Sequence, residues 1–217
     1  MNREDLNLYL VTDKELANGK ALEDIVEEAV KGGVSMVQIR EKEANSKDFY
    51  QLADTVKKVL EKYKVPLIIN DRLDIALAVD ADGLHIGQSD LPYHVARKIL
   101  GPNKIIGLSV ENIEQARQAN QLDVDYIGLS PVFSTQTKND IAKPLELDGV
   151  KEIMSFSKHP AVAIGGINST NTADIIKAGA DGIAVVSAIV CAEDPCNAAK
   201  ELKEIVNKSL SLKEIDS

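Results

Sequence analysis

Eight short aliphatic runs recur along this chain, and a stretch with helical periodicity separates each from the next. Near-continuous apolarity indicates strands that are covered on both faces, as in a parallel sheet. The runs are Leu8–Val11, Met36–Ile39, Pro66–Ile69, Gly83–Ile86, Ile105–Leu108, Tyr126–Leu129, Ala161–Ile164 and Gly182–Val185. Few folds accommodate eight such strands in alternation with helices.

The intervening stretches carry the apolar stripe of amphipathic helices. Between residues 22 and 30 apolar side chains recur at i, i+3, i+4, i+7 and i+8, and Gly32-Gly33 follows as a helix end. The same spacing appears over residues 49–60 and 198–206. Asp194-Pro195 has the composition of an N-cap followed by the first helical position, so it predicts the start of the last helix.

Strand and helix alternate without a polar linker, which predicts an α/β fold: a single (β/α)8 TIM barrel with right-handed crossovers. We expect one domain over residues 1–217, with the barrel from about residue 6 to residue 207 and a frayed tail over 208–217. The helix at about Arg72–Val79 must be short. A doubly wound open sheet is therefore the alternative fold.

Composition limits the classes of partner. The net charge of −9 argues against nucleic acid or an anionic membrane as a partner, although local loops can still bind phosphate. There is no apolar run of the ~18 residues that a membrane helix needs and no secretory-type N-terminal segment, so we expect a cytoplasmic protein. Cys191 and Cys196 are the only cysteines, and we expect two reduced thiols.

In such a barrel the active site lies at the carboxyl ends of the strands. Gln38, Arg40 and Lys42 alternate at the end of the second run, so their side chains point to the same face. Two cations aimed at the mouth of a barrel make an anion site, and Gln38 can hydrogen-bond a heterocycle or a phosphate. A strand rim with solvated charges is the alternative interpretation.

Two aspartates follow neighbouring strands. Asp71 comes after the third run, in Asn70-Asp71-Arg72, and Asp90 comes after the fourth. Oxygen ligands from adjacent strands suit Mg²⁺, which keeps several waters and bridges to a substrate diphosphate. Each aspartate alone is more typical of a helix N-cap. His85, within the fourth run, fits core packing or an orienting role better than catalysis.

A second group of polar and glycine residues follows the later strands. Ser109 leaves a hydroxyl at the rim, and the loop from Ser130 to Lys138 is rich in hydroxyls. Gly165-Gly166 after the seventh run, with a short helix expected after Val186, matches the phosphate cradle of such barrels. Two anion sites on one rim predict two phosphorylated ligands, or one ligand with two phosphates.

Six segments in register resemble the thiamine-phosphate synthase family. They are Leu8-Tyr9-Leu10-Val11-Thr12-Asp13, Val37-Gln38-Ile39-Arg40-Glu41-Lys42, Ile69-Asn70-Asp71-Arg72, His85-Ile86-Gly87-Gln88-Ser89-Asp90, Pro131-Val132-Phe133-Ser134-Thr135-Gln136-Thr137-Lys138 and Ile164-Gly165-Gly166-Ile167. The resemblance runs from about residue 6 to residue 207, and all six motifs together are very specific.

The resemblance implies a transferase that joins hydroxymethylpyrimidine diphosphate to a methyl(phosphoethyl)thiazole, with or without a carboxyl group, and releases pyrophosphate. It implies that pyrophosphate leaves first and that the thiazole nitrogen attacks the resulting pyrimidine carbocation, with no protein nucleophile. The implied metal is Mg²⁺ on Asp71 and Asp90. The residues implied to hold the pyrimidine diphosphate are Gln38, Arg40, Lys42, Asn70 and Lys138, with Ser109 beside it.

The thiazole phosphate has its own implied contacts. Thr135 and Thr137 would contact it, and the backbone of Gly166, Val186 and Ser187 would hold its phosphate. The residues that we assign to catalysis are Arg40, Ser109 and Lys138. Outer barrel helices also leave a homo-oligomer open.

Two positions depart from the family pattern. Ser134 stands where the family often has proline, and Glu111 stands where relatives often carry histidine. A related family of thiazole tautomerases relies on that histidine and tends to lack the metal aspartates, so this chain resembles the synthases more closely. A phosphate-binding isomerase barrel, which would need a general acid–base pair, and a non-catalytic ligand-binding homologue are two further candidates.

Overall fold

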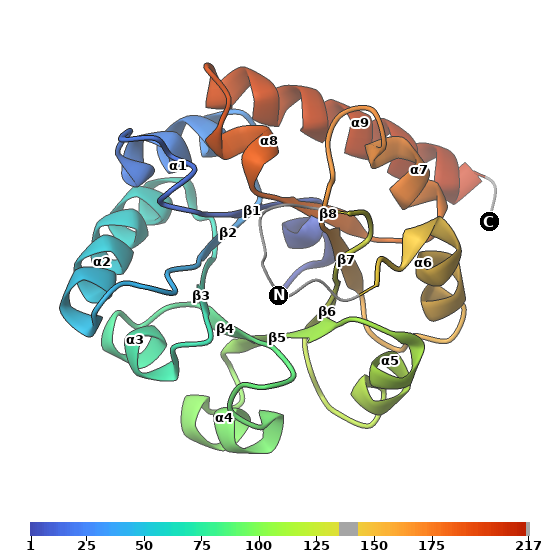
Figure 1. Ribbon diagram of the computed structural model, residues 1–217, viewed down its shortest axis with the longest axis horizontal. Helices are drawn as coiled ribbons and strands as arrows, with labels where there is room; N and C mark the ends of the chain where they lie inside the picture. Colours follow the sequence, from blue (N-terminus) through green and yellow to red (C-terminus); the bar gives the residue numbers. More distant parts are fainter. Residues whose placement is uncertain (135–142, 216–217) are drawn as a thin grey trace.

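The computed structural model describes residues 1–134 and 143–215, and it is a closed barrel of parallel strands surrounded by helices (Figure 1). The strands pair in chain order, and β1 pairs with β8 to close the sheet. The strands are β1 Leu8–Val11, β2 Met36–Ile39, β3 Leu67–Asn70, β4 Gly83–Ile86, β5 Ile105–Val110, β6 Tyr126–Leu129, β7 Ala161–Ile164 and β8 Gly182–Val185.

The helices form the outer ring, with α9 packed against α1 and α7 (Figure 1). None of the described helices is long and apolar enough to cross a membrane. The helices are η1 Arg3–Leu6, α1 Leu22–Lys31, α2 Ser46–Tyr63, α3 Leu73–Ala78, α4 Tyr93–Leu100, α5 Ile113–Ala119, α6 Glu146–Met154, α7 Thr172–Lys177, α8 Ser187–Val190 and α9 Pro195–Ile215.

The predicted barrel is confirmed, and pairing of Tyr9 with Ala184 excludes the open sheet. Strand bounds differ from the prediction only at β3, which is displaced by a residue, and at β5, which continues to Val110. The predicted frayed tail is wrong for residues 208–215, because α9 extends to Ile215. Ser209 is buried there, and Lys213 Nζ donates to the Gly179 carbonyl at 2.8 Å.

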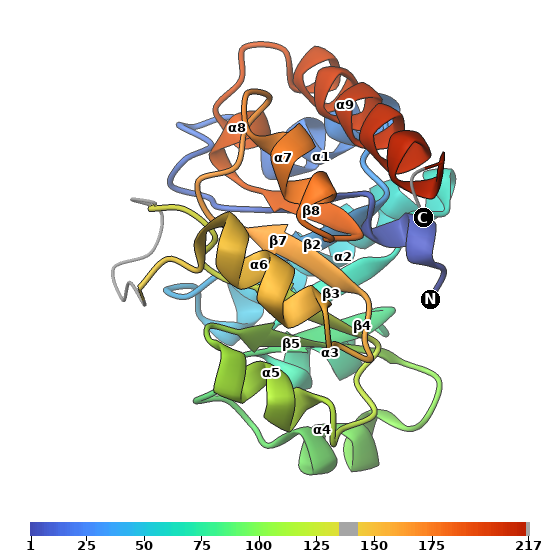
Figure 2. The same cartoon turned by 90° about the vertical axis from the view of Figure 1, so that its right-hand side faces the viewer.

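Two apolar cores lie on the two faces of the sheet. The larger core fills the space between the strands and the helices. The smaller core lies inside the barrel and includes Tyr9, Met36 and Tyr126. Leu6 of η1 joins it from the amino-terminal end, and Figure 2 places this turn at the end of the barrel opposite α8. The interior is therefore closed at one end, which leaves the carboxyl ends of the strands as the open mouth.

The same side-chain-to-backbone hydrogen bond recurs four times at the closed, amino-terminal end of the barrel. The residue before each even-numbered strand accepts a backbone N–H from the strand before it. Ser35 Oγ accepts from Leu8 N at 3.0 Å, whereas Asp82, Asp125 and Asp181 each accept through Oδ2 at 2.8 Å. These bonds satisfy strand-start donors that the ladder leaves unpaired. They fix the register at the amino-terminal end of the barrel.

Asp181→Ala should lower the free energy of unfolding by about 1–3 kcal/mol, because the buried Ala161 N–H would lose its acceptor. The measurement is urea unfolding, in which the midpoint should fall without a change in slope. Asp148→Ala is the control, because that side chain is 99% exposed and its loss should change stability by less than about 0.5 kcal/mol. Equal stability of the two variants would contradict the anchoring role.

Candidate functional site

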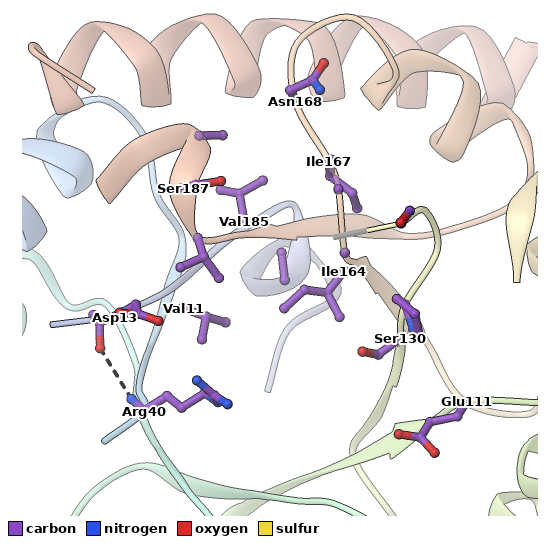
Figure 3. A pocket seen from close by; sticks show the side chains of 18 residues that line it. Val11, Asp13, Arg40, Glu111, Ser130, Ile164, Ile167, Asn168, Val185 and Ser187 are labelled. Atoms are coloured by element: carbon purple, nitrogen blue, oxygen red, sulfur yellow. Dashed lines mark hydrogen bonds between the residues drawn. The ribbon is translucent and has the colours of Figure 1, made fainter. Parts of the chain in front are cut away.

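A cavity of about 440 Å³ opens at the mouth of the barrel, between the carboxyl ends of β1, β7 and β8 (Figure 3). Arg40, Gly166, Val186 and Ser187, all predicted site residues, line it. The structure therefore brings together the predicted phosphate cradle and one cation of the predicted anion site. Its lining mixes polar groups with aliphatic side chains such as Val185, which suits a ligand with an apolar ring and a charged end.

The cradle is built by glycine backbone. Gly165 and Gly166 have φ angles of 108° and 65°, and a Cβ on Gly166 would lie 2.8 Å from the Ser134 carbonyl oxygen. Only glycine adopts this backbone without strain. The loop after β6 is tied to it, because Val132 N donates to the Ile164 carbonyl at 2.9 Å. Two adjacent loops thus hold each other in place beside the cavity.

The short helix α8 contributes the other half of the cradle. Ser187 is its first residue and lies at the cavity wall (Figure 3). The first N–H groups of a helix have no partner within the helix and carry partial positive charge. Together with the glycine loop they offer a phosphate backbone donors instead of side-chain charge, which matters in a protein of net charge −9.

Arg40 and Glu111 enter the cavity from opposite sides (Figure 3). Arg40 follows β2, and its backbone N–H donates to Thr12 Oγ1 at 3.3 Å. Glu111 follows β5, and its backbone N–H donates to Gln115 Oε1 at 2.7 Å. Asp13 also lines the cavity. The predictions did not include Asp13 or Glu111 as lining residues, since neither sits in a pattern of like residues.

Asp71 and Asp90 form a pair of half-buried carboxyl groups beyond the cavity, and their side chains are within hydrogen-bonding contact. The pKa of Asp71 is raised to about 6, mainly by burial and secondly by the nearby Asp90 carboxylate. The charge of Lys42 opposes this shift. Asp90 Oδ2 also accepts from the Gly87 N–H at 2.6 Å. Neither aspartate caps a helix, because the N-cap residues of α3 and α4 are Arg72 and Pro92. The N-cap alternative is therefore wrong.

The carboxyl pair fits a hard divalent cation. Two carboxylates held together against their mutual repulsion gain stability when a cation lies between them. In residues 1–134 and 143–215 there is no cluster of three or more acidic, histidine or cysteine side chains that could hold a metal. Mg²⁺ commonly takes one or two carboxylates and completes its shell with water and substrate phosphate. The donor set thus suits Mg²⁺ and does not suit zinc.

Other predicted residues lie around this pair. Asn70, at the end of β3, hydrogen-bonds the Asp71 carboxyl and lowers its pKa. Lys42 is exposed, and its charge also lowers the Asp71 pKa. Gln38 and Ser109 lie deeper, where Gln38 is only 4% exposed. The predicted residues Thr135, Thr137 and Lys138 lie outside the described residues.

Two tyrosines inside the barrel belong to the same environment and were not predicted. Gln38 Nε2 donates to the Tyr9 hydroxyl at 2.8 Å, and the Tyr9 and Tyr126 hydroxyls are 2.9 Å apart. His85 contacts both the Tyr126 hydroxyl and Ser109 Oγ. These contacts agree with an orienting role for His85. The only sequence signal for the tyrosines is their position in the alternating pattern of strands β1 and β6.

Comparison with known proteins identifies close relatives. Residues 8–189 match the family described as thiamine monophosphate synthase. A protein from Syntrophomonas wolfei named thiamine-phosphate synthase is 54% identical, with 94% of this chain and 98% of that protein covered. One of the same name from Clostridium novyi is 50% identical, over 93% of this chain and all of that protein.

Solved structures agree in fold. The thiamine phosphate pyrophosphorylase from Pyrococcus furiosus superposes with a TM-score of 0.88 at 41% identity, covering 96% of this chain and 98% of that one. A 3-hexulose-6-phosphate synthase superposes with a TM-score of 0.69 at 19% identity, over 92% of this chain and 99% of that chain. This second likeness concerns the barrel fold alone.

Gly166→Ala should weaken the binding of inorganic phosphate by about tenfold, because a left-handed backbone costs a residue with a Cβ roughly 1–2 kcal/mol and the methyl would crowd Ser134. Isothermal titration calorimetry measures the change. Gly19→Ala is the matched control, because Gly19 has a φ of 83° but open space where a Cβ would lie. The cradle assignment fails if both variants bind phosphate as the unmodified protein does.

Proposed function

The chain belongs to the thiamine monophosphate synthase family, and we propose that the mouth of its barrel joins hydroxymethylpyrimidine diphosphate to methyl(phosphoethyl)thiazole. The products are thiamine monophosphate and pyrophosphate. The observation that carries this proposal is that two groups of residues suited to binding phosphate lie on one rim. One is the backbone cradle at β7 and β8, and the other is the cation and carboxyl group cluster at β2 to β4.

The pyrimidine diphosphate occupies the side of the mouth formed by β2, β3 and β5. Arg40 reaches into the cavity, and Lys42 lies near enough to the carboxyl pair to lower the Asp71 pKa. These two cations bind the diphosphate, and Lys138 adds a third. Gln38, Asn70 and Ser109 contact the pyrimidine diphosphate, because polar groups of low exposure can recognise a ligand by hydrogen bonds.

Asp71 and Asp90 would hold Mg²⁺. When bound, the ion neutralises charge on the diphosphate and so makes pyrophosphate a better leaving group. Asn70 supports this site because its hydrogen bond to the Asp71 carboxyl favours the charged form of that carboxyl. The Gly87 N–H donates to Asp90 Oδ2 at 2.6 Å and so orients that carboxyl group. Both aspartates are thus oriented by neighbours before any ligand arrives.

The thiazole occupies the cavity, with its phosphate on the backbone of Gly166, Val186 and Ser187. Thr135 and Thr137 complete its contacts. Aliphatic side chains from β1, β7 and β8 line the wall beside the ring, for example Val11, Ile164 and Val185 (Figure 3). This places the thiazole across the mouth from the leaving group. A carboxylated thiazole is a second proposed form of this substrate.

The chemistry needs positioning more than a protein nucleophile. The bond between the pyrimidine methylene carbon and the diphosphate oxygen breaks, and pyrophosphate leaves with the electron pair. The thiazole nitrogen then donates its lone pair to the resulting carbocation. Arg40, Lys138 and Ser109 stabilise the leaving group and hold the reactants together, which can supply a large part of the barrier reduction.

A thiazole tautomerase is the second candidate from the sequence, and two residues weigh against it. Glu111, in the cavity wall, stands where tautomerase relatives carry histidine, so this chain lacks the imidazole on which those relatives rely. The Asp71 and Asp90 pair has no role in a tautomerisation without diphosphate. The synthase reaction uses both proposed anion sites. It therefore gives a role to more of the residues at the rim than a tautomerisation does.

The direct test is pyrophosphate release by the purified protein with both substrates and Mg²⁺, leaving out each component in turn. Release should require all three components and should accompany formation of thiamine monophosphate. Chelation with EDTA should stop the reaction and added Mg²⁺ should restore it. Pyrophosphate release that persists without the thiazole, or no release from folded protein, would contradict the proposal.

Asp71→Asn and Lys138→Ala should each lower turnover by about a hundredfold or more, because each removes part of the charge stabilisation at the leaving group. The measurement is steady-state pyrophosphate release, with thermal unfolding to show that the fold is retained. Asp148→Asn is the matched control, since it makes the same chemical change at a side chain that is 99% exposed on α6. Its turnover should equal that of the unmodified protein, and a wild-type rate in Asp71→Asn would refute the metal assignment.

A further inference from the structure

Five polar side chains form one hydrogen-bonded chain across the interior of the barrel. Gln38 Nε2 lies 2.8 Å from the Tyr9 hydroxyl, and the Tyr9 hydroxyl lies 2.9 Å from that of Tyr126. The Tyr126 hydroxyl lies 2.9 Å from His85 Nδ1, and His85 Nε2 lies 2.9 Å from Ser109 Oγ. The chain starts at one proposed substrate-binding residue and ends at another.

The barrel wall is shaped to hold the middle of this chain. A Cβ on Gly107 would lie 2.1 Å from the Tyr126 ring and 2.6 Å from His85 Nδ1, and a Cβ on Gly128 would lie 3.2 Å from His85 Cε1. Glycines on β5 and β6 therefore leave the space in which the two rings meet. The ring centroids of Tyr126 and His85 are 5.6 Å apart.

The donors in this chain can be assigned from its Gln38 end. Burial raises the pKa of both Tyr9 and Tyr126, so each hydroxyl keeps its hydrogen. Each of these hydrogens therefore needs an acceptor. The Gln38 amide nitrogen only donates, so Tyr9 accepts there and donates to Tyr126. Tyr126 in turn donates to His85 Nδ1, since a buried O–H without an acceptor is costly.

The direction of these hydrogen bonds then determines which ring nitrogen of His85 carries the hydrogen. An imidazole that accepts at Nδ1 is neutral and carries its hydrogen on Nε2. Nε2 therefore donates to Ser109 Oγ, which leaves the hydrogen of the Ser109 hydroxyl for a ligand. Without this chain a serine hydroxyl rotates to suit whichever partner is present.

We propose that Tyr126 and His85 are positioning residues that hold Ser109 as a hydrogen-bond donor to the pyrimidine diphosphate. This role rests on the proposed function for its ligand, but the state of His85 does not. The chain turns a serine with a freely rotating hydroxyl into one with a fixed direction.

The first test is a ¹⁵N NMR measurement of the His85 ring in the unmodified protein without substrates. The two ring nitrogens report separately whether each carries a hydrogen, and His85→Gln assigns the signals. We expect hydrogen on Nε2 alone. Hydrogen on Nδ1 alone, or on both nitrogens, would overturn the proposal. Because no turnover is involved, this result stands or falls independently of the proposed function.

Two hydroxyl deletions of equal size provide a matched comparison by the same measurement. Tyr126→Phe removes the donor to His85 Nδ1, so the preference for Nε2 should weaken. Tyr9→Phe removes an equally buried hydroxyl but leaves the Tyr126 donor in place, so the preference should remain. A preference unchanged by Tyr126→Phe would contradict the proposed direction of the chain.

The second test is a double-mutant cycle on kcat/KM with Ser109→Ala and Tyr126→Phe. Tyr126→Phe alone should lower kcat/KM by about tenfold, the effect of one lost hydrogen bond. In the Ser109→Ala background it should have almost no further effect, because Tyr126 acts through that hydroxyl. Losses that multiply in the double variant would show a merely structural role and overturn the proposal.

Discussion

Backbone hydrogen bonds between β1 and β8 close the sheet, and every feature of the site depends on that closure. A closed parallel sheet has no free edge and one defined interior. Because side chains alternate along a strand, closure assigns each residue either to the interior or to the layer beneath the helices. It also brings all eight carboxyl ends to one rim, where loops that are far apart in sequence can share a ligand.

The two ends of the barrel carry different kinds of polar contact. At the amino-terminal end, Asp82, Asp125 and Asp181 accept backbone N–H groups and hold strand starts in register. At the carboxyl end, Asp71 and Asp90 face each other, and burial raises the Asp71 pKa. Residues of one chemical type thus hold strand starts at one end and form a closely placed carboxyl pair at the other, according to what surrounds them.

The interior core is mostly aliphatic, as in other barrels of this kind, but a chain of hydrogen-bonded polar groups crosses it. Tyr9 and Tyr126 are 1% and 0% exposed, yet both hydroxyls have partners, so their burial carries no unsatisfied group. A fully satisfied polar chain restricts side-chain orientation more than apolar packing does. Through this chain the interior of the barrel contacts Gln38 at one end and Ser109 at the other.

The sequence alone determined the barrel, the strand bounds to within two residues and the adjacency of Asp71 and Asp90, because strand periodicity and the strand-end rule are local properties. It did not indicate that residues 208–215 continue α9, since the contact of Lys213 with Gly179 is not local. It also gave no sign that Tyr9 meets Tyr126, a partner 117 residues away. Only closure of the sheet decides which inward-facing side chains touch, and in this barrel that contact sets the hydrogen-bond geometry of the site.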